Sequence, residues 1–176
     1  MKLPELIVNC IRHATANVFS TMLGVEVRQG EVRTENGAPD ANDGVVSLIG
    51  LAGTWTGAGS ISCSPALACR ICSVLLMTEN TAVDEDVLDA VAELTNMIIG
   101  SVKTDLEEHL GPLGLSIPTV VFGRNFRTRS AANADWMVVP FDWDGEILQV
   151  RLCLTRTERD TRSHLQMASH ACTVDV

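Results

Sequence analysis

The stretch that decides the fold is Asp84–Glu108, DEDVLDAVAELTNMIIGSVKTDLEE. Its apolar residues recur at intervals of three and four, which is typical of one face of a long amphipathic helix. They are Val87, Val91, Leu94, Ile98, Val102 and Leu106. The acidic residues at its start suit the positive end of a helix dipole. The stretch therefore predicts a long helix with one face buried in a core.

The polar face of this helix holds the most site-like residues of the chain. Along it follow Asp89, Glu93, Asn96, Gly100, Lys103 and Glu107. The spacing of Glu93 and Asn96 places both side chains on one side of the helix, about one turn apart. Asn is a poor residue for a helix centre because its amide competes with the backbone for hydrogen bonds. The row predicts a place where a partner approaches closely, and the alternative is an ordinary solvated helix face.

Length and composition bound the architecture. The 176 residues fit one domain, and 46% hydrophobic residues suffice for a globular core. We expect a single domain over residues 1–155. Residues 156–176 are polar and lack a clean period, so they predict a flexible tail.

Charge limits the partners. The formal net charge of -9 argues against a nucleic-acid partner, because no basic patch is visible. The acidic surface either favours a basic partner or serves solubility alone. No apolar run approaches the length of a membrane span, and the residues after Met1 do not form a signal peptide. We therefore expect a cytoplasmic protein without membrane insertion.

The six cysteines do not predict a metal site. Cys69 and Cys72 form a CxxC motif, but no second pair of cysteines or histidines stands at ligand spacing. The motif also lies inside an apolar helical run rather than at the start of a helix, where a redox-active pair is found. We expect buried, reduced cysteines and no bound metal or cofactor.

The order of the predicted elements indicates an α+β fold with mainly antiparallel sheets. Two long helices are expected at Pro4–Leu23 and Asp84–Glu108, with a shorter one from Pro65 to Leu76 after the capping residue Ser64. Strands are expected at Val25–Arg33, Val45–Leu51, Trp55–Cys63, Ser116–Gly123, Ala134–Asp142 and Glu146–Leu154, and a surface loop at Thr34–Gly44. Each half then places a helix before three strands, which predicts antiparallel sheets from two pseudo-repeated halves.

The segment Asp89–Gly100, DAVAELTNMIIG, resembles the signature of the chemotaxis phosphatase family that includes CheX and CheC. That signature is E-x-x-N followed by small residues. The segment Ala14–Gly24, ATANVFSTMLG, is similar to the first helix of the CheX-like branch, and the element order agrees over roughly residues 1–155.

The resemblance implies a phosphatase that hydrolyses the aspartyl phosphate of a response regulator similar to CheY. It implies that Glu93 pairs with a lysine of the regulator's active site and that Asn96 orients the attacking water. The magnesium ion would belong to the regulator. Asp89, Gly100 and Lys103 become candidates for partner contact.

The first helix departs from the pattern of CheC-like relatives, which carry a motif in each half. Its residues Glu5–Val8 read ELIV, so this chain has one motif, and one motif implies the dimeric CheX-like branch. Two further hypotheses stay open: a module that binds a regulator without catalysis, and a scaffold subunit of a signalling complex.

Overall fold

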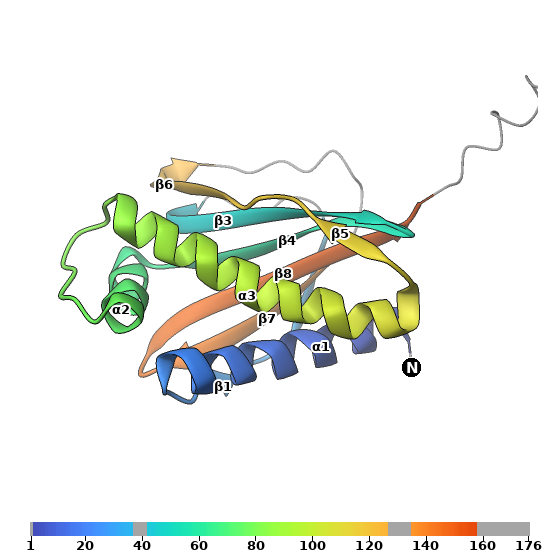
Figure 1. Ribbon diagram of the computed structural model, residues 1–176, viewed down its shortest axis with the longest axis horizontal. Coiled ribbons are helices and arrows are strands. Elements are labelled where there is room, and N and C mark those ends of the chain that lie inside the picture. The colour runs from blue at the N-terminus through green and yellow to red at the C-terminus, as the bar shows by residue number, and fades with distance from the viewer. Residues whose placement is uncertain (1, 37–41, 127–134, 158–176) are drawn as a thin grey trace, which may run out of the picture.

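The computed structural model describes residues 2–36, 42–126 and 135–157, and it contains one antiparallel sheet with helices on one face (Figure 1). The helices are α1 (Leu3–Val18), continued by the π-helix η1 (Phe19–Leu23), α2 (Pro65–Leu76) and α3 (Glu85–Leu110). The strands are β1 (Arg28–Gln29), β2 (Arg33–Asn36), β3 (Asn42–Gly53), β4 (Trp55–Cys63), β5 (Leu113–Leu115), β6 (Thr119–Phe126), β7 (Asp135–Trp143) and β8 (Glu146–Arg156).

The sheet has eight strands in the order β1-β7-β8-β4-β3-β5, with β2 also on β7 and β6 also on β3. The α+β prediction with antiparallel pairing is confirmed, but the described strands form one sheet rather than separate ones. A single sheet results because β4 and β8, from the two halves of the chain, pair along Trp55–Ser62. The predicted duplication of the halves stays a prediction.

Helix α3 covers the predicted stretch Asp84–Glu108 but begins at Glu85 and continues to Leu110. The side chain of Asp84 caps it by accepting a hydrogen bond from the N–H of Val87 at 3.0 Å, and Gly111 ends it with φ +84°. The predicted apolar stripe is fully buried. Helices α1 and α3 lie side by side beneath the sheet (Figure 1), so this stripe forms the centre of the core.

The predicted strand Val25–Arg33 is wrong. The chain instead forms two short strands, β1 and β2, both paired with β7. Between them it passes Pro140, which has no N–H to give to a neighbouring strand. Only a hydrogen bond from the N–H of Gly30 to the carbonyl of Pro140, 2.8 Å long, joins the chains there. The proline on β7 therefore divides the expected strand.

Three other boundaries differ from the prediction. Strand β2 occupies residues 33–36, which include the start of the expected loop Thr34–Gly44. Strand β3 already begins at Asn42, and residues 37–41 lie outside the described part. The strand expected at Ser116–Gly123 begins only at Thr119, as β6, because Pro118 precedes it, and β5 is a separate short strand that ends before Ser116. Strand β8 continues to Arg156, and Thr157 donates to the carbonyl of Gly53 at 2.9 Å. The remaining tail, residues 158–176, is outside the described residues.

The five described cysteines are buried and free, as predicted. Burial, followed by the charge of the nearby Glu146 carboxylate, raises the pKa of the Cys63 thiol to about 12. These cysteines therefore behave as small apolar residues. None of the described helices is both long and apolar enough to cross a membrane.

Candidate functional site

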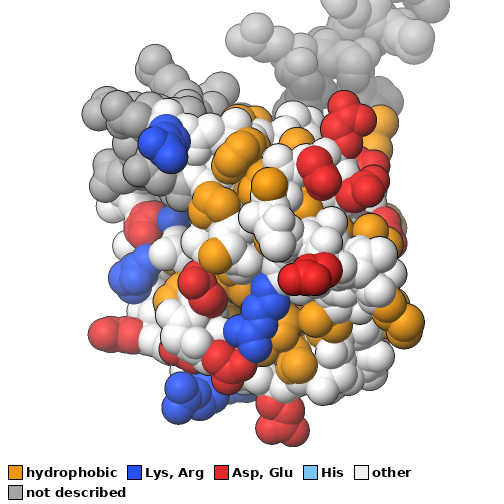
Figure 2. All heavy atoms as spheres, turned by 90° about the vertical axis from the view of Figure 1, so that its left-hand side faces the viewer, with side chains coloured by type: hydrophobic (Ala, Val, Ile, Leu, Met, Phe, Trp, Pro, Cys, Tyr) orange, Lys and Arg blue, Asp and Glu red, His pale blue; other side chains and the backbone are white. Residues whose placement is uncertain are grey.

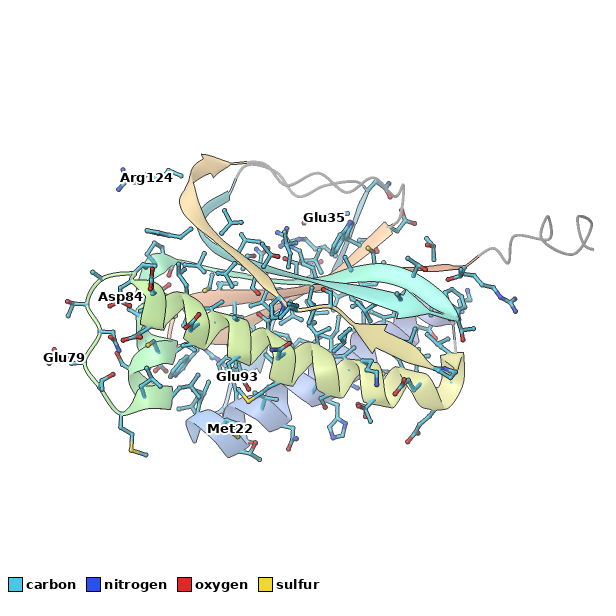
Figure 3. All side chains as sticks on the ribbon, turned by 45° about the horizontal axis from the view of Figure 1, so that its top comes forward. Met22, Glu35, Glu79, Asp84, Glu93 and Arg124 are labelled. Atoms are coloured by element: carbon cyan, nitrogen blue, oxygen red, sulfur yellow. The ribbon has the colours of Figure 1, made fainter. Side chains whose placement is uncertain are left out.

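A groove of about 750 Å³ runs along the exposed side of α3. Its floor is the helix itself, its walls come from η1 and α2 on one side, and the segment between β5 and β6 forms the other side. Figure 3 shows Glu93 projecting from α3 on the side of Met22. The floor is formed by Asp86, Asp89, Ala90, Ala92, Glu93, Asn96 and Met97. The sequence motif thus lies inside the groove.

Glu93 and Asn96 are free to bind a partner. Glu93 is exposed and Asn96 is half-buried. Neither side chain forms a hydrogen bond or ion pair with another residue in the described part of the chain. Their neighbour Thr95 is different: it is buried, and its hydroxyl donates to the carbonyl of Val91 at 2.8 Å. The hydrogen-bonded hydroxyl of Thr95 therefore lies on the buried side of the helix, whereas the Glu93 and Asn96 side chains lie on the groove side.

The wall formed by η1 depends on a local change in helix geometry. Phe19 is fully buried and packs edge-on against Trp143, with ring centroids 5.8 Å apart. The π-helical turn that follows ends at Gly24, which has φ +66°. Met22 in this turn is 52% exposed and lines the groove, although the α-helical period of the expected helix Pro4–Leu23 predicts it on the apolar face, four residues after Val18. The prediction is wrong because a regular α-helical period does not apply across a π-helix.

Two further apolar residues on the groove were missed by sequence reasoning. Leu76, at the end of α2, is 51% exposed, and Ile117, between β5 and β6, is 87% exposed. Both line the groove. The sequence predicts Ile117 within the strand Ser116–Gly123, but the following Pro118 indicates that regular strand structure is interrupted there. Single exposed apolar residues are common, whereas several around one groove mark a contact surface.

The groove is acidic. Asp86, Asp89 and Glu93 line it, and none of the described lining residues carries a positive charge. Figure 2 shows acidic side chains among apolar ones on the end of the molecule that carries α2. Such a surface suits a partner with a cationic group at the centre of its own binding face.

The predicted contact residues separate into two groups. Asp89 lies in the groove beside Glu93, whereas Gly100 and Lys103 are not among its lining residues. The nearest group to a Cβ placed on Gly100 would be Leu115 Cδ1 at 4.0 Å, so this position leaves open space. The Lys103 ammonium instead pairs with the Glu107 carboxylate at 2.8 Å. Contact of Gly100 and Lys103 with a partner stays a prediction.

The donor set of the groove does not resemble a metal centre. Across the described residues, no three His, Cys, Asp or Glu side chains are placed to hold one ion together. The carboxylates of the groove follow one helix face instead of converging. The chemistry available here is an amide, a carboxylate and an apolar border.

Comparison with known proteins identifies the family of this chain. The sequence matches the family described as Chemotaxis phosphatase CheX over residues 45–142, which include all of α3. The chain belongs to the CheX family. The protein named CheY-P phosphatase CheX from Thermotoga maritima is 31% identical over 126 residues, covering 70% of this chain and 80% of that protein.

Solved structures of CheX proteins share the fold. The CheX chemotaxis protein from Vibrio vulnificus is 27% identical with a TM-score of 0.76, covering 85% of this chain and 99% of that one. The CheX from Borrelia burgdorferi, solved as a CheX–CheY–BeF3–Mg2+ complex, is 24% identical with a TM-score of 0.74 and covers 85% and 98%. The second likeness concerns the fold. This chain is accordingly a phosphatase of the CheX family.

Proposed function

We propose that this CheX-family protein hydrolyses the aspartyl phosphate of a CheY-like response regulator, with Glu93 and Asn96 as its working residues. The observation that carries the proposal is that Glu93 and Asn96 lie on the floor of an acidic groove with an apolar border, and that their side chains have no hydrogen-bond or ion-pair partner in the described part of the chain. The Thermotoga relative is named a CheY-P phosphatase, which supports this substrate.

Asn96 is suited to holding the attacking water. Its amide can accept one hydrogen bond and donate another, so it can fix a water in line with the phosphorus–oxygen bond. Phosphoryl transfer needs positioning and charge neutralisation more than covalent chemistry. The magnesium ion that supplies the neutralisation would be held by the regulator.

Glu93 is suited to anchoring. A carboxylate on an exposed helix face can form a charge-assisted hydrogen bond with the active-site lysine of a regulator. A lysine so paired neutralises the carboxylate, which leaves Glu93 a poor general base. Asp89 and Asp86, one and two turns before it, add to the attraction for a cationic partner.

The deciding experiment measures phosphate release from a phosphorylated CheY-like regulator. We expect Asn96→Ala to slow stimulated release on the order of a hundredfold, with an unchanged melting temperature because the side chain is only half-buried. Asn17→Ala is the matched control, since Asn17 is an exposed helical asparagine outside the groove. A fully active Asn96→Ala protein would refute the catalytic role. Binding without stimulated release by the wild type would favour the non-catalytic module.

We also propose that the protein is a cytoplasmic homodimer joined through a sheet edge. In the described part of the chain, β6 is paired only with β3, which leaves its other edge free to meet a second chain. Sedimentation of the purified chain tests this: a monomer at all concentrations would contradict it.

The duplication of the two halves is the last part of the proposal, and the sheet order supports it. β4 and β8 occupy the centre, β3 and β7 flank them, and each flanking strand carries an outer strand from the other half: β6 on β3 and β2 on β7. Helices α1 and α3 then correspond, and only α3 carries the motif.

A further inference from the structure

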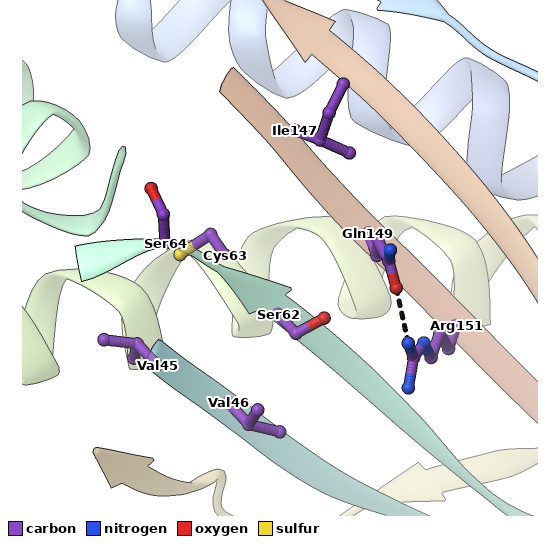
Figure 4. Close-up of a pocket in the computed structure, with 8 residues that line it drawn as sticks. All are labelled: Val45, Val46, Ser62, Cys63, Ser64, Ile147, Gln149 and Arg151. Atoms are coloured by element: carbon purple, nitrogen blue, oxygen red, sulfur yellow. Dashed lines mark hydrogen bonds between the residues drawn. The ribbon is translucent and has the colours of Figure 1, made fainter. Parts of the chain in front are cut away.

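A second, smaller pocket lies on the face of the sheet opposite α1 and α3 (Figure 4). Side chains alternate along β8: Leu148 and Val150 point into the core, so Gln149 and Arg151 point to the other face. The pocket holds about 210 Å³, less than a site for a drug-sized molecule. Its polar side chains are Ser62, Ser64, Gln149 and Arg151, and Val46 and Ile147 border it.

Arg151 is the unusual member of this pocket. It is only 6% exposed, although it stands on the face without α1 and α3. One terminal nitrogen donates to the side-chain oxygen of Gln149, and its Nε has no hydrogen-bond partner among the described residues. No carboxylate of the described residues forms an ion pair with it. A guanidinium stays charged in proteins, and a buried charge without a partner is costly.

Two carboxylates near the pocket are engaged with other groups. Glu35 pairs with Arg33 at 3.5 Å, and Glu146 accepts a hydrogen bond from the Ser64 hydroxyl at 2.6 Å. Burial lowers the pKa of Arg151; the Glu35 carboxylate opposes this, and the smaller effect of the Arg33 charge lowers the pKa as well. Because Glu35 is paired with Arg33, the charge of Arg151 is left without a carboxylate of its own among the described residues.

We propose that this pocket binds a small oxyanion, the phosphate or carboxylate group of a small molecule, through Arg151. The guanidinium presents parallel N–H groups that match two oxygens of such an anion. Because the oxygen of Gln149 already accepts from Arg151, its NH2 group is left to donate to the anion. The Ser62 hydroxyl, on the neighbouring strand, is a further donor. The anion neutralises the charge of Arg151 and accepts a hydrogen bond from its Nε–H.

This site is independent of the groove on α3. The two lie on opposite faces of the sheet and share no lining residue. A variant that loses phosphatase activity is therefore not expected to lose anion binding, and the reverse also holds. The proposed anion site does not depend on the phosphatase mechanism.

The test is calorimetric titration of the full chain with inorganic phosphate and, separately, with acetate, at constant ionic strength in chloride. We expect saturable binding of at least one of the two anions. The anion that binds more tightly shows whether the site prefers a phosphate or a carboxylate group. Arg151→Met should weaken this binding at least tenfold. Its melting temperature in chloride should equal or exceed that of the wild type, because replacing an unpaired buried charge removes a cost.

Two further variants keep the result decisive. Gln149→Leu leaves Arg151 in place and removes the amide donor, so it should weaken anion binding even if Arg151→Met fails to fold. Arg28→Met is the control, since Arg28 is highly exposed and pairs with Asp142. No saturable binding by the wild type, or equal affinity in Gln149→Leu and wild type, would overturn the proposal. So would a dimer that dissociates on Arg151→Met, because a second chain would then supply the counter-charge.

Discussion

Ile99 of α3 packs directly on the backbone of Gly59 in β4. A Cβ on Gly59 would lie 3.0 Å from Cδ1 and 3.1 Å from Cγ1 of Ile99, closer than side chains normally approach. Glycine thus lets α3 sit against the middle of the sheet, with Ile99 inward. Since Asn96 precedes Ile99 by less than one turn and Glu93 lies on the same side as Asn96, this contact also fixes which way the working pair faces.

The first prediction follows from that contact. Gly59→Ala should lower the free energy of unfolding by about 1–3 kcal/mol, because an added methyl overpacks the interface. Ile99→Ala alone should cost about 2–5 kcal/mol by leaving a cavity. The double variant should lose at least ~0.5 kcal/mol less than the sum, since the shortened side chain makes room for the methyl. Urea unfolding of all four proteins measures this coupling.

Gly114→Ala is the control for that cycle. Its Cβ would lie 3.5 Å from the carbonyl of Ala52, which is an ordinary contact. We expect little change in stability there. Strict additivity of Gly59→Ala and Ile99→Ala would mean that the two positions are not in energetic contact.

The second prediction separates anchoring from catalysis. Glu93→Gln keeps the shape of the side chain and removes its charge, so it should raise KM for the phosphorylated regulator about tenfold or more and change kcat much less. The effect should shrink at high salt, because screening weakens the wild-type attraction. Steady-state phosphate release at two salt concentrations provides the measurement. A loss in kcat with unchanged KM would assign Glu93 to the chemistry instead.

Sequence reasoning succeeded where the signals are local. The acidic start of α3 and its apolar stripe lie within one segment, and the structure confirms the helix and the burial of the stripe. The same is true of α2, whose cap Ser64 accepts a hydrogen bond from the N–H of Leu67 at 3.0 Å. The motif could be recognised because Glu93 and Asn96 share a single helix.

It failed where distant segments act on one another. The division between β1 and β2 depends on Pro140, which lies more than a hundred residues later and only becomes a neighbour in the folded sheet. The groove walls likewise bring together Met22, Leu76 and Ile117 from three separate regions. The periodic pattern of residues within one segment does not indicate contacts between distant segments. At Met22 the π-helical turn also changes the helical period itself.

The third prediction concerns the apolar border of the groove. Ile117→Ser should weaken binding of the regulator about tenfold, because burying an isoleucine side chain contributes roughly 1.5–3 kcal/mol. Its own stability should hardly change, since Ile117 is 87% exposed in the free protein. Ile147→Ser is the matched control: it is also an exposed isoleucine, but it lies on the opposite face. Affinity measured by fluorescence titration that falls equally for both variants would remove Ile117 from the contact surface.

The fourth prediction concerns the junction between α3 and β5. One oxygen of Glu107 accepts from the Lys103 ammonium at 2.8 Å, and the other accepts from the N–H of Leu113 at 2.8 Å. The hydrogen bond from Lys103, followed by that from Leu113, lowers the pKa of Glu107. Protonation therefore occurs at lower pH in the folded than in the unfolded chain. The stabilisation is complete above the ordinary glutamate pKa of about 4.3 and is lost as pH falls through the lowered folded value.

Glu107→Gln should consequently lower the melting temperature at pH 7, and its difference from the wild type should shrink as the pH falls below about 4. Glu108→Gln, at the exposed neighbouring position, is the control and should change the melting temperature little at either pH. Thermal unfolding from pH 7 to pH 3 makes the comparison. If Glu107→Gln stays less stable than the wild type by the same margin throughout, the carboxylate charge is not what holds the end of α3 to β5.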